Sequence, residues 1–151
     1  MLFRSILYFA ADDGVHGEEL WKSDGTAEGS GLVKDLAIYP SSSNLLLQAS
    51  VSCTLYFTAN DGVQGQELWK SDGTEEGTLL VKNIYPGGGA PYSRYPDPYQ
   101  GGPRDMTGVR GTLYFTAPDR VNGWGLWKSD GTEEGTVFLK QLSTKIGRAH
   151  V

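Results

Sequence analysis

Short runs of alternating apolar and polar residues, separated by turn-forming residues, recur along the chain. In the middle of the sequence this alternation, together with many aromatic and β-branched residues, predicts four short strands. We expect them at residues 46–51, 54–58, 67–71 and 79–84. The connections between the second and third strands and between the third and fourth are rich in Asp, Gly and Thr. These residues tolerate positive φ or accept hydrogen bonds from local amides. The pattern therefore predicts an all-β chain built from four-stranded antiparallel meanders.

Apolar side chains fall on both faces of the predicted strands. Alternate residues of a strand point to opposite faces, so Leu55 and Phe57 share one face while Tyr56 lies on the other. A sheet that is apolar on both faces needs a neighbour on each side. This favours tandem meanders stacked as β-propeller blades, with about three blades in an incomplete ring. The alternative is a β-sandwich, which normally keeps a polar outer face.

A hexapeptide, Trp-Lys-Ser-Asp-Gly-Thr, occurs three times, at residues 21–26, 69–74 and 127–132. The intervals are 48 and 58 residues, and the ten extra residues of the second interval fall between positions 83 and 102. Repeats of this period indicate one structural unit per copy. The expected units are blade 1 at 1–36, blade 2 at 37–84 and blade 3 at 85–145, with an inserted loop at 86–103.

The residues around the hexapeptide carry a family resemblance. The segments from Glu19 to Thr26 and from Glu67 to Thr74 both read Glu-Leu-Trp-Lys-Ser-Asp-Gly-Thr, and the third copy has Gly125 in place of the Glu. This motif resembles the repeat of the bacterial ELWxxDGT family, and the resemblance spans roughly residues 7–142. It implies a propeller-like repeat region of a protein that is secreted or displayed on the cell surface. It implies no characterised activity.

Both ends of the sequence suggest a piece of a longer protein. Met1 aligns with Ala49, inside the first predicted strand of the middle unit, so blade 1 is expected to be truncated at its N-terminus. Closed propellers have about 4 to 8 blades, and three do not readily close a ring. We therefore expect further repeats of the parent chain as partners. Residues 146–151 resemble a translated sequencing adapter and are expected to be a non-native tail.

Charge and cysteine content narrow the classes of function. Thirteen Lys and Arg against eighteen Asp and Glu give a net charge of −5, which argues against nucleic acid as a partner. The single cysteine, Cys53, cannot form an intrachain disulfide. No apolar run approaches the roughly 18 residues of a transmembrane helix, so no membrane span is expected. The apolar N-terminus recurs in the other units, which predicts a strand rather than a signal peptide.

The repeated tryptophans and aspartates are expected to be structural. Trp21, Trp69 and Trp127 share one strand position, where a large aromatic ring fills the space between neighbouring sheets. Each hexapeptide also has an aspartate before Gly-Thr, where a carboxylate can accept hydrogen bonds from backbone amides and hold the turn. These aspartates are Asp24, Asp72 and Asp130.

Three carboxylates between the second and third strands of the units form the candidate metal site: Asp13, Asp61 and Asp119. If they converged at one rim, they could bind Ca²⁺, which prefers several oxygen ligands. The alternative is turn chemistry, in which each carboxylate serves its own loop. The regular calcium-loop pattern is absent, and the sequence indicates no other cofactor.

The inserted loop provides most of the candidate ligand-binding residues, namely Tyr92, Arg94, Tyr95 and Tyr99. Tyr and Arg dominate compact recognition patches. In a meander this loop emerges at the same end as the connection between strands two and three. It should therefore share a rim with Trp124 and His16. The alternatives are a Gly-Pro linker, packing of Trp124 against the insertion, and a solvated His16.

These features favour a non-enzymatic extracellular or cell-surface module for recognition or adhesion, with a carbohydrate or a protein as ligand. The sequence has no nucleophile elbow, phosphate-binding loop or evident pair of glycosidase carboxylates, so no catalytic residue is assigned. Two alternatives stay open. The chain could be a fragment of a propeller-type enzyme that acts on polysaccharides, or a purely structural spacer.

Overall fold

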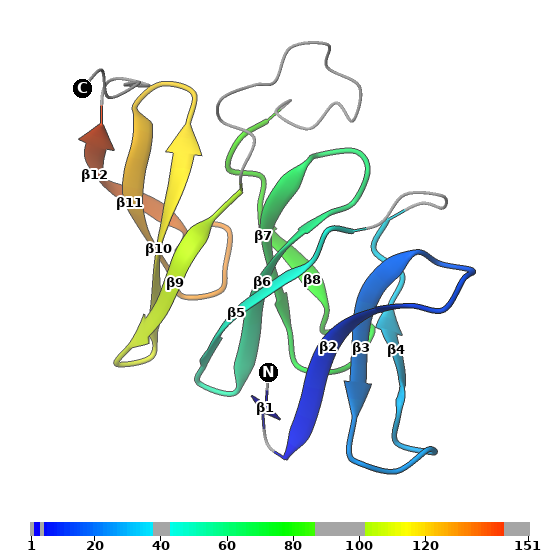
Figure 1. The fold of residues 1–151 in the computed structure, drawn as a ribbon. Helices are drawn as coiled ribbons and strands as arrows, with labels where there is room; N and C mark the ends of the chain where they lie inside the picture. The colour runs from blue at the N-terminus through cyan, green and yellow to red at the C-terminus, as the bar shows by residue number, and fades with distance from the viewer. Residues whose placement is uncertain (1, 4, 38–42, 87–101, 144–151) are drawn as a thin grey trace, which may run out of the picture.

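The computed structural model contains three antiparallel β-sheets (Figure 1). It describes residues 2–3, 5–37, 43–86 and 102–143. The first sheet contains β1 (Leu2–Phe3), β2 (Ile6–Asp12), β3 (Glu18–Ser23) and β4 (Gly31–Lys34). The second contains β5 (Leu46–Val51), β6 (Thr54–Asn60), β7 (Gln66–Ser71) and β8 (Leu79–Lys82). The third contains β9 (Arg104–Val109), β10 (Thr112–Asp119), β11 (Gly123–Ser129) and β12 (Val137–Ser143).

Each sheet is an open meander in which every strand pairs with its neighbours in the sequence. The predicted all-β class and antiparallel pairing are therefore confirmed. In the second sheet β5 has the predicted bounds, β6 and β7 are slightly longer than predicted, and β8 ends at Lys82 rather than at residue 84. Within the described ranges, nothing resembles a helix long and apolar enough to cross a membrane.

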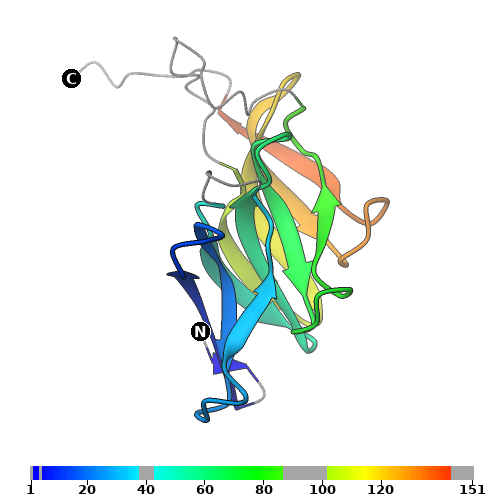
Figure 2. The same ribbon diagram turned by 90° about the vertical axis from the view of Figure 1, so that its right-hand side faces the viewer.

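The three sheets stack with the second between the first and the third (Figure 2). Because side chains alternate, each sheet has two faces, which we name after their repeated aromatic residues. The Tyr face carries the tyrosine of each Leu-Tyr-Phe run: Tyr8, Tyr56 and Tyr114. The Trp face carries the tryptophan of each hexapeptide: Trp21, Trp69 and Trp127.

Each contact between neighbouring sheets joins a Tyr face to a Trp face. One hydrophobic core lies between the first and second sheets and includes Tyr8, Leu20, Leu55, Phe57 and Trp69. The other lies between the second and third sheets and includes Tyr56, Leu68, Leu113, Phe115 and Trp127. The second sheet is therefore buried on both faces, as the alternation of its strands predicts. Among the described residues, the first and third sheets each have one face without a neighbouring sheet.

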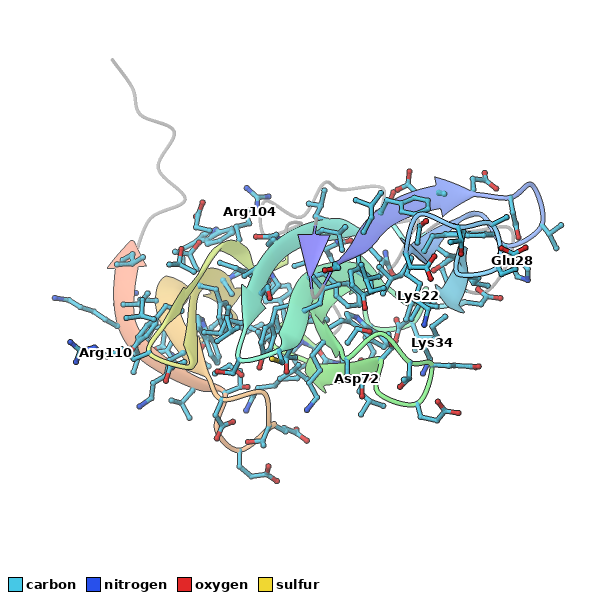
Figure 3. The ribbon with its side chains drawn as sticks, turned by 90° about the horizontal axis from the view of Figure 1, so that it is seen from below. Lys22, Glu28, Lys34, Asp72, Arg104 and Arg110 are labelled. Atoms are coloured by element: carbon cyan, nitrogen blue, oxygen red, sulfur yellow. The ribbon has the colours of Figure 1, made fainter. Side chains whose placement is uncertain are left out.

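Lysines on the Tyr face add polar contacts to each core. Lys22 Nζ donates a hydrogen bond to the carbonyl oxygen of Gly73 over 2.7 Å, and Lys70 Nζ donates to that of Gly131 over the same distance. Lys34, which is labelled with Lys22 in Figure 3, donates to the carbonyl oxygen of Thr78 at 2.9 Å. The lysine of one hexapeptide thus binds the Asp-Gly-Thr turn of the next, which supplies partners for carbonyl groups that packing shields from water.

The Asp-Gly-Thr turn also contacts the tyrosine of the preceding sheet. Gly73 has a φ of +93°, and the Tyr8 hydroxyl occupies the place where a Cβ at this residue would stand. Gly73→Ala should therefore lower the free energy of unfolding by about 2 kcal/mol, part from the left-handed backbone and part from displacement of Tyr8. Chemical denaturation followed by tryptophan fluorescence measures this loss.

Gly25→Ala is the matched control for this substitution. Gly25 has a φ of +95°, and an added Cβ would meet no atom within 4 Å. At a concentration where light scattering gives the mass of one chain, it should cost only the backbone strain, about 1 kcal/mol. Equal losses in the two variants would contradict the packing of Tyr8 on the Gly73 turn.

A buried glutamate ends the fourth strand of the first two sheets. Glu67 is buried, and its Oε2 and Oε1 accept hydrogen bonds from the backbone N–H groups of Ile84 (2.8 Å) and Tyr85 (3.0 Å). Glu19 does the same for Leu36 and Ala37 in the first sheet. These amides are bound by a carboxylate instead of a neighbouring strand, so the chain leaves the sheet soon after β4 and β8.

The third sheet lacks this glutamate, and its last strand is longer. Gly125 stands at the corresponding position, and the ring of Phe138 occupies the space that a Cβ would need. Phe138 also packs edge-on against Trp127, with ring centroids 5.5 Å apart. Without a carboxylate to hold its amides, β12 keeps pairing with β11 as far as Ser143. The Glu-to-Gly difference between the repeats thus explains the different lengths of β8 and β12.

Candidate binding rim

Three turns lie at one end of the stacked sheets, the upper end in Figure 1. They are the β2–β3, β6–β7 and β10–β11 turns, at residues 13–17, 61–65 and 119–123. Tyr85 and Arg104, which flank the inserted loop on either side, lie at the same end because β8 leaves the sheet there and β9 enters it. We call this set the rim. The meander topology brings these loops together from three separate repeats.

An aspartate organises each rim turn. The Oδ1 atom of Asp13 accepts hydrogen bonds from the N–H groups of Val15 and His16, both at 2.9 Å. Asp61 binds the corresponding amides of Val63 and Gln64, and Asp119 those of Val121 and Asn122. Each carboxylate therefore holds the backbone of its own loop.

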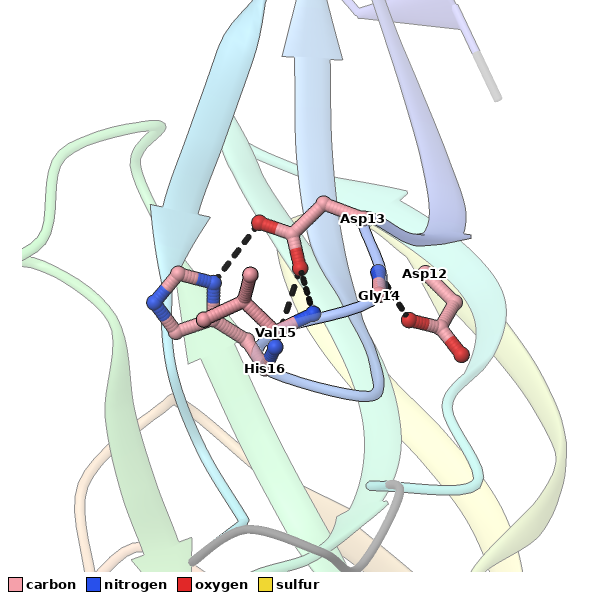
Figure 4. Close-up of polar contacts among 5 residues, drawn as sticks. All are labelled: Asp12, Asp13, Gly14, Val15 and His16. Carbon is pink, nitrogen blue, oxygen red and sulfur yellow. Dashed lines mark hydrogen bonds and ion pairs between the residues drawn. The ribbon is translucent and has the colours of Figure 1, made fainter.

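His16 folds back onto the same carboxylate. Its Nδ1 lies 2.7 Å from Asp13 Oδ2 (Figure 4). This hydrogen bond raises the pKa of the His16 ring above its ordinary value. The N–H of His16, its ring and the N–H of Val15 lower the pKa of Asp13 to about 2. Asn122 takes the equivalent position in the third sheet, where its Nδ2 donates to Asp119 Oδ2 at 2.9 Å. The His16 ring therefore closes the β2–β3 turn in the same way that the Asn122 side-chain amide closes the β10–β11 turn.

The rim carboxylates do not assemble into a metal centre in the described residues. Asp13, Asp61 and Asp119 each direct an oxygen at the amides of their own loop. Across the ranges that the structure describes, no three His, Cys, Asp or Glu side chains come close enough together to hold a metal ion. The arrangement is that of three separate capped turns.

Two arginines pack on aromatic rings at the rim. The guanidinium carbon of Arg104 lies 5.4 Å from the ring centroid of Trp124, and that of Arg120 lies 5.0 Å from that of Tyr85. Both arginines are exposed, and both rings are partly buried. Cation–π contact at this distance is favourable and restricts the motion of a long side chain. The rim therefore presents two arginine–aromatic pairs, and two of their residues, Tyr85 and Arg104, flank the inserted loop in the sequence.

The sequence identified only part of this arrangement. It singled out Trp124, but Arg104, Arg120 and Tyr85 were missed. The available signal was Arg120, which stands where the other repeats have Gly14 and Gly62. The other ligand-binding candidates lie outside the described residues: Tyr92, Arg94, Tyr95 and Tyr99.

The hexapeptide turns lie at the opposite end of the sheets. Asp72 Oδ1 accepts hydrogen bonds from the N–H of Thr74 (2.9 Å) and from its hydroxyl (2.7 Å), which together lower the pKa of Asp72. The same pattern holds for Asp24 with Thr26 and for Asp130 with Thr132. Of the three hexapeptide tryptophans, Trp69 and Trp127 are buried between sheets and Trp21 is partly buried.

Comparisons of the chain with family models, curated proteins and solved structures find no match.

Proposed function

We propose that the chain is a non-enzymatic recognition module of the ELWxxDGT type, which acts outside the cell or on its surface and uses its three sheets as propeller blades. The repeated motif and the regular stacking of Tyr faces on Trp faces support the blade arrangement. β5 and β9, the first strands of the second and third sheets, lie side by side. Strands near the central axis of a propeller would lie in this way. Such a scaffold leaves its loops free to meet a ligand.

The observation that carries the recognition role is the pair of arginine–aromatic contacts at the rim. Arg104 and Trp124 both belong to the third sheet, whereas the pair of Arg120 and Tyr85 joins the third sheet's β10–β11 turn to the segment after β8 of the second sheet. Side chains that are already ordered lose less entropy when they bind. The three rim aspartates each direct an oxygen at the amides of their own turn, whereas the arginines are exposed with their guanidinium groups on aromatic rings.

The chemistry of the rim favours a protein ligand over a glycan. Trp, Tyr and Arg are the residue types that contribute most to protein–protein binding energy. Guanidinium groups bind carboxylates in a bidentate geometry. The ligand class that fits is therefore a surface protein with an acidic patch.

Trp124→Gln tests this function by introducing the residue type that Gln66 provides in the second sheet. On an array of surface proteins and glycans, we expect this variant to bind its protein ligands at least about tenfold more weakly, a loss of about 1.4 kcal/mol. The matched control is Val109→Ala, since Val109 is 48% exposed and ends β9 at the opposite end of the sheets from the rim. The control should bind like the unmodified chain.

Unchanged binding by Trp124→Gln would contradict the proposed role of the rim. Replacement of both Arg94 and Tyr95 should likewise weaken binding without unfolding the chain, and tests the contribution of the inserted loop. Cleavage of an arrayed glycan, abolished by substitution of one carboxylate, would favour the enzyme alternative. Binding to glycans alone would contradict the proposed ligand class.

A further inference from the structure

The first sheet leaves its Trp face uncovered. Leu7 on this face is 43% exposed, whereas the corresponding Leu55 and Leu113 are fully buried, at 0%. Phe9 and Trp21 on the same face are only partly buried. The first sheet thus carries the same residues that form a core in the second and third sheets, and no sheet of the described residues packs on them.

The third sheet leaves its Tyr face uncovered. Leu139 on this face is 43% exposed, while the corresponding Val33 and Val81 are 6% and 4% exposed. Tyr114 is partly buried and Lys128 is exposed, although the tyrosines at the same position of the other sheets are buried. The chain therefore carries one open Trp face and one open Tyr face, at opposite ends of its stack of sheets (Figure 2).

These two open faces have the features that join the sheets within the chain. Lys128 is the counterpart of Lys22, whose ammonium group binds the carbonyl oxygen of Gly73. Gly25 is the counterpart of Gly73 and is exposed, with open space where a tyrosine hydroxyl would lie. Both the lysine donor and the turn that would accept its hydrogen bond are thus present, but on faces too far apart to meet in one chain.

We propose that a second copy of this chain docks head to tail, with the Tyr face of its third sheet packed on the Trp face of the first sheet. Such a contact repeats, between chains, the two contacts already formed inside each chain. It would bury Leu7 against the surface around Leu139, and it would bring Lys128 of one copy to the Gly25 turn of the other. Burial of apolar surface drives the association, and the lysine sets its register.

Head-to-tail contacts use two different surfaces, so they close into a ring or continue as a filament. Two copies would bring six sheets together. This number lies within the range of about 4 to 8 blades in closed propellers. The association does not depend on the rim, because the open faces are the flat sides of the outer sheets. Its failure would leave the proposed recognition function untouched.

The mass of the full chain in solution tests the proposal. Size-exclusion chromatography with light scattering should give a mass of at least two chains at about 100 μM, a concentration that saturates an interface with a micromolar Kd. Leu7→Asp blocks the Trp face and Leu139→Asp blocks the Tyr face. Each variant alone should stay at the mass of one chain, because an unpaired carboxylate in the contact is costly.

A mixture of the two variants distinguishes head-to-tail docking from other modes of association. Leu7→Asp keeps an intact Tyr face and Leu139→Asp keeps an intact Trp face, so the mixture should form a one-to-one heterodimer. Lys128→Ala, a milder change, should weaken the association of the unmodified chain at least about threefold without abolishing it.

Three results would overturn the proposal. They are a single-chain mass for the unmodified protein at the highest concentration, unreduced association of either Asp variant, and no heterodimer in the mixture. Both leucines are exposed, at 43%, so both variants should keep the circular dichroism spectrum of the unmodified chain. An unchanged spectrum shows that a variant has lost its association without losing its fold.

Discussion

Phe57→Ala is expected to lower the free energy of unfolding by about 3–5 kcal/mol, the range for a buried Phe truncated to Ala in a well-packed core. Phe57 is fully buried between the first and second sheets. Its removal leaves a cavity lined by residues of two sheets, which cannot collapse without moving one sheet against the other. Because natural domains have only about 5–15 kcal/mol of stability, the variant should be close to unfolding. Urea denaturation measures the change.

Phe9→Ala is the matched control, since Phe9 has the same place in the first repeat but lies on an uncovered face. At a concentration where light scattering gives the mass of one chain, it should cost at most about 1.5 kcal/mol, because little apolar area is lost from the core. Phe115→Ala, between the second and third sheets, should cost as much as Phe57→Ala. A loss in Phe9→Ala as large as that in Phe57→Ala would contradict the assignment of the open face.

The sheets could be predicted from local rules because their determinants are local. Alternation of Leu55, Tyr56 and Phe57 gives the strand and its two apolar faces. The Asp-Gly-Thr turns are held by a side chain two residues away, which a sequence shows directly. The end of β8 was wrong by two residues because it depends on Glu67, whose carboxylate binds amides 17 and 18 residues further along the chain.

The rim could be predicted in its position but not in its residues. Meander topology alone puts His16 and Trp124 at the same end of the sheets. The stacking of Arg104 on Trp124 depends on the register of β9 against β10, and that register contains a bulge between Tyr114 and Thr116. Comparison of the repeats emphasises positions that all copies share. Residues found in one copy only, such as Arg120, stand out less, although they make the site specific.

The unfolding free energy is expected to fall as the pH rises from about 4.5 to 7, because of Glu67. Burial, opposed by two backbone hydrogen bonds, raises the pKa of this carboxyl from 4.5 to about 7. Between these values the folded chain binds a proton that the unfolded chain has released. Stability therefore decreases with pH in this window. A shift of this size corresponds to about 3 kcal/mol, which is fully lost above about pH 7.

Glu67→Gln isolates this effect, because an amide has no charge to bury at any of these pH values. Urea denaturation at intervals between pH 4.5 and 8 should show a fall of about 3 kcal/mol in the unmodified chain that is largely absent in the variant. Burial also raises the pKa of Glu19, so a smaller fall of the same sign should persist in the variant. Glu76→Gln, at an exposed position of the same sheet, should leave the fall intact.

If the curves of the unmodified chain and Glu67→Gln run parallel from pH 5 to 7, the buried carboxyl is not the group that titrates. If stability instead rises with pH in that window, the two backbone hydrogen bonds outweigh burial and Glu67 is charged in the folded protein.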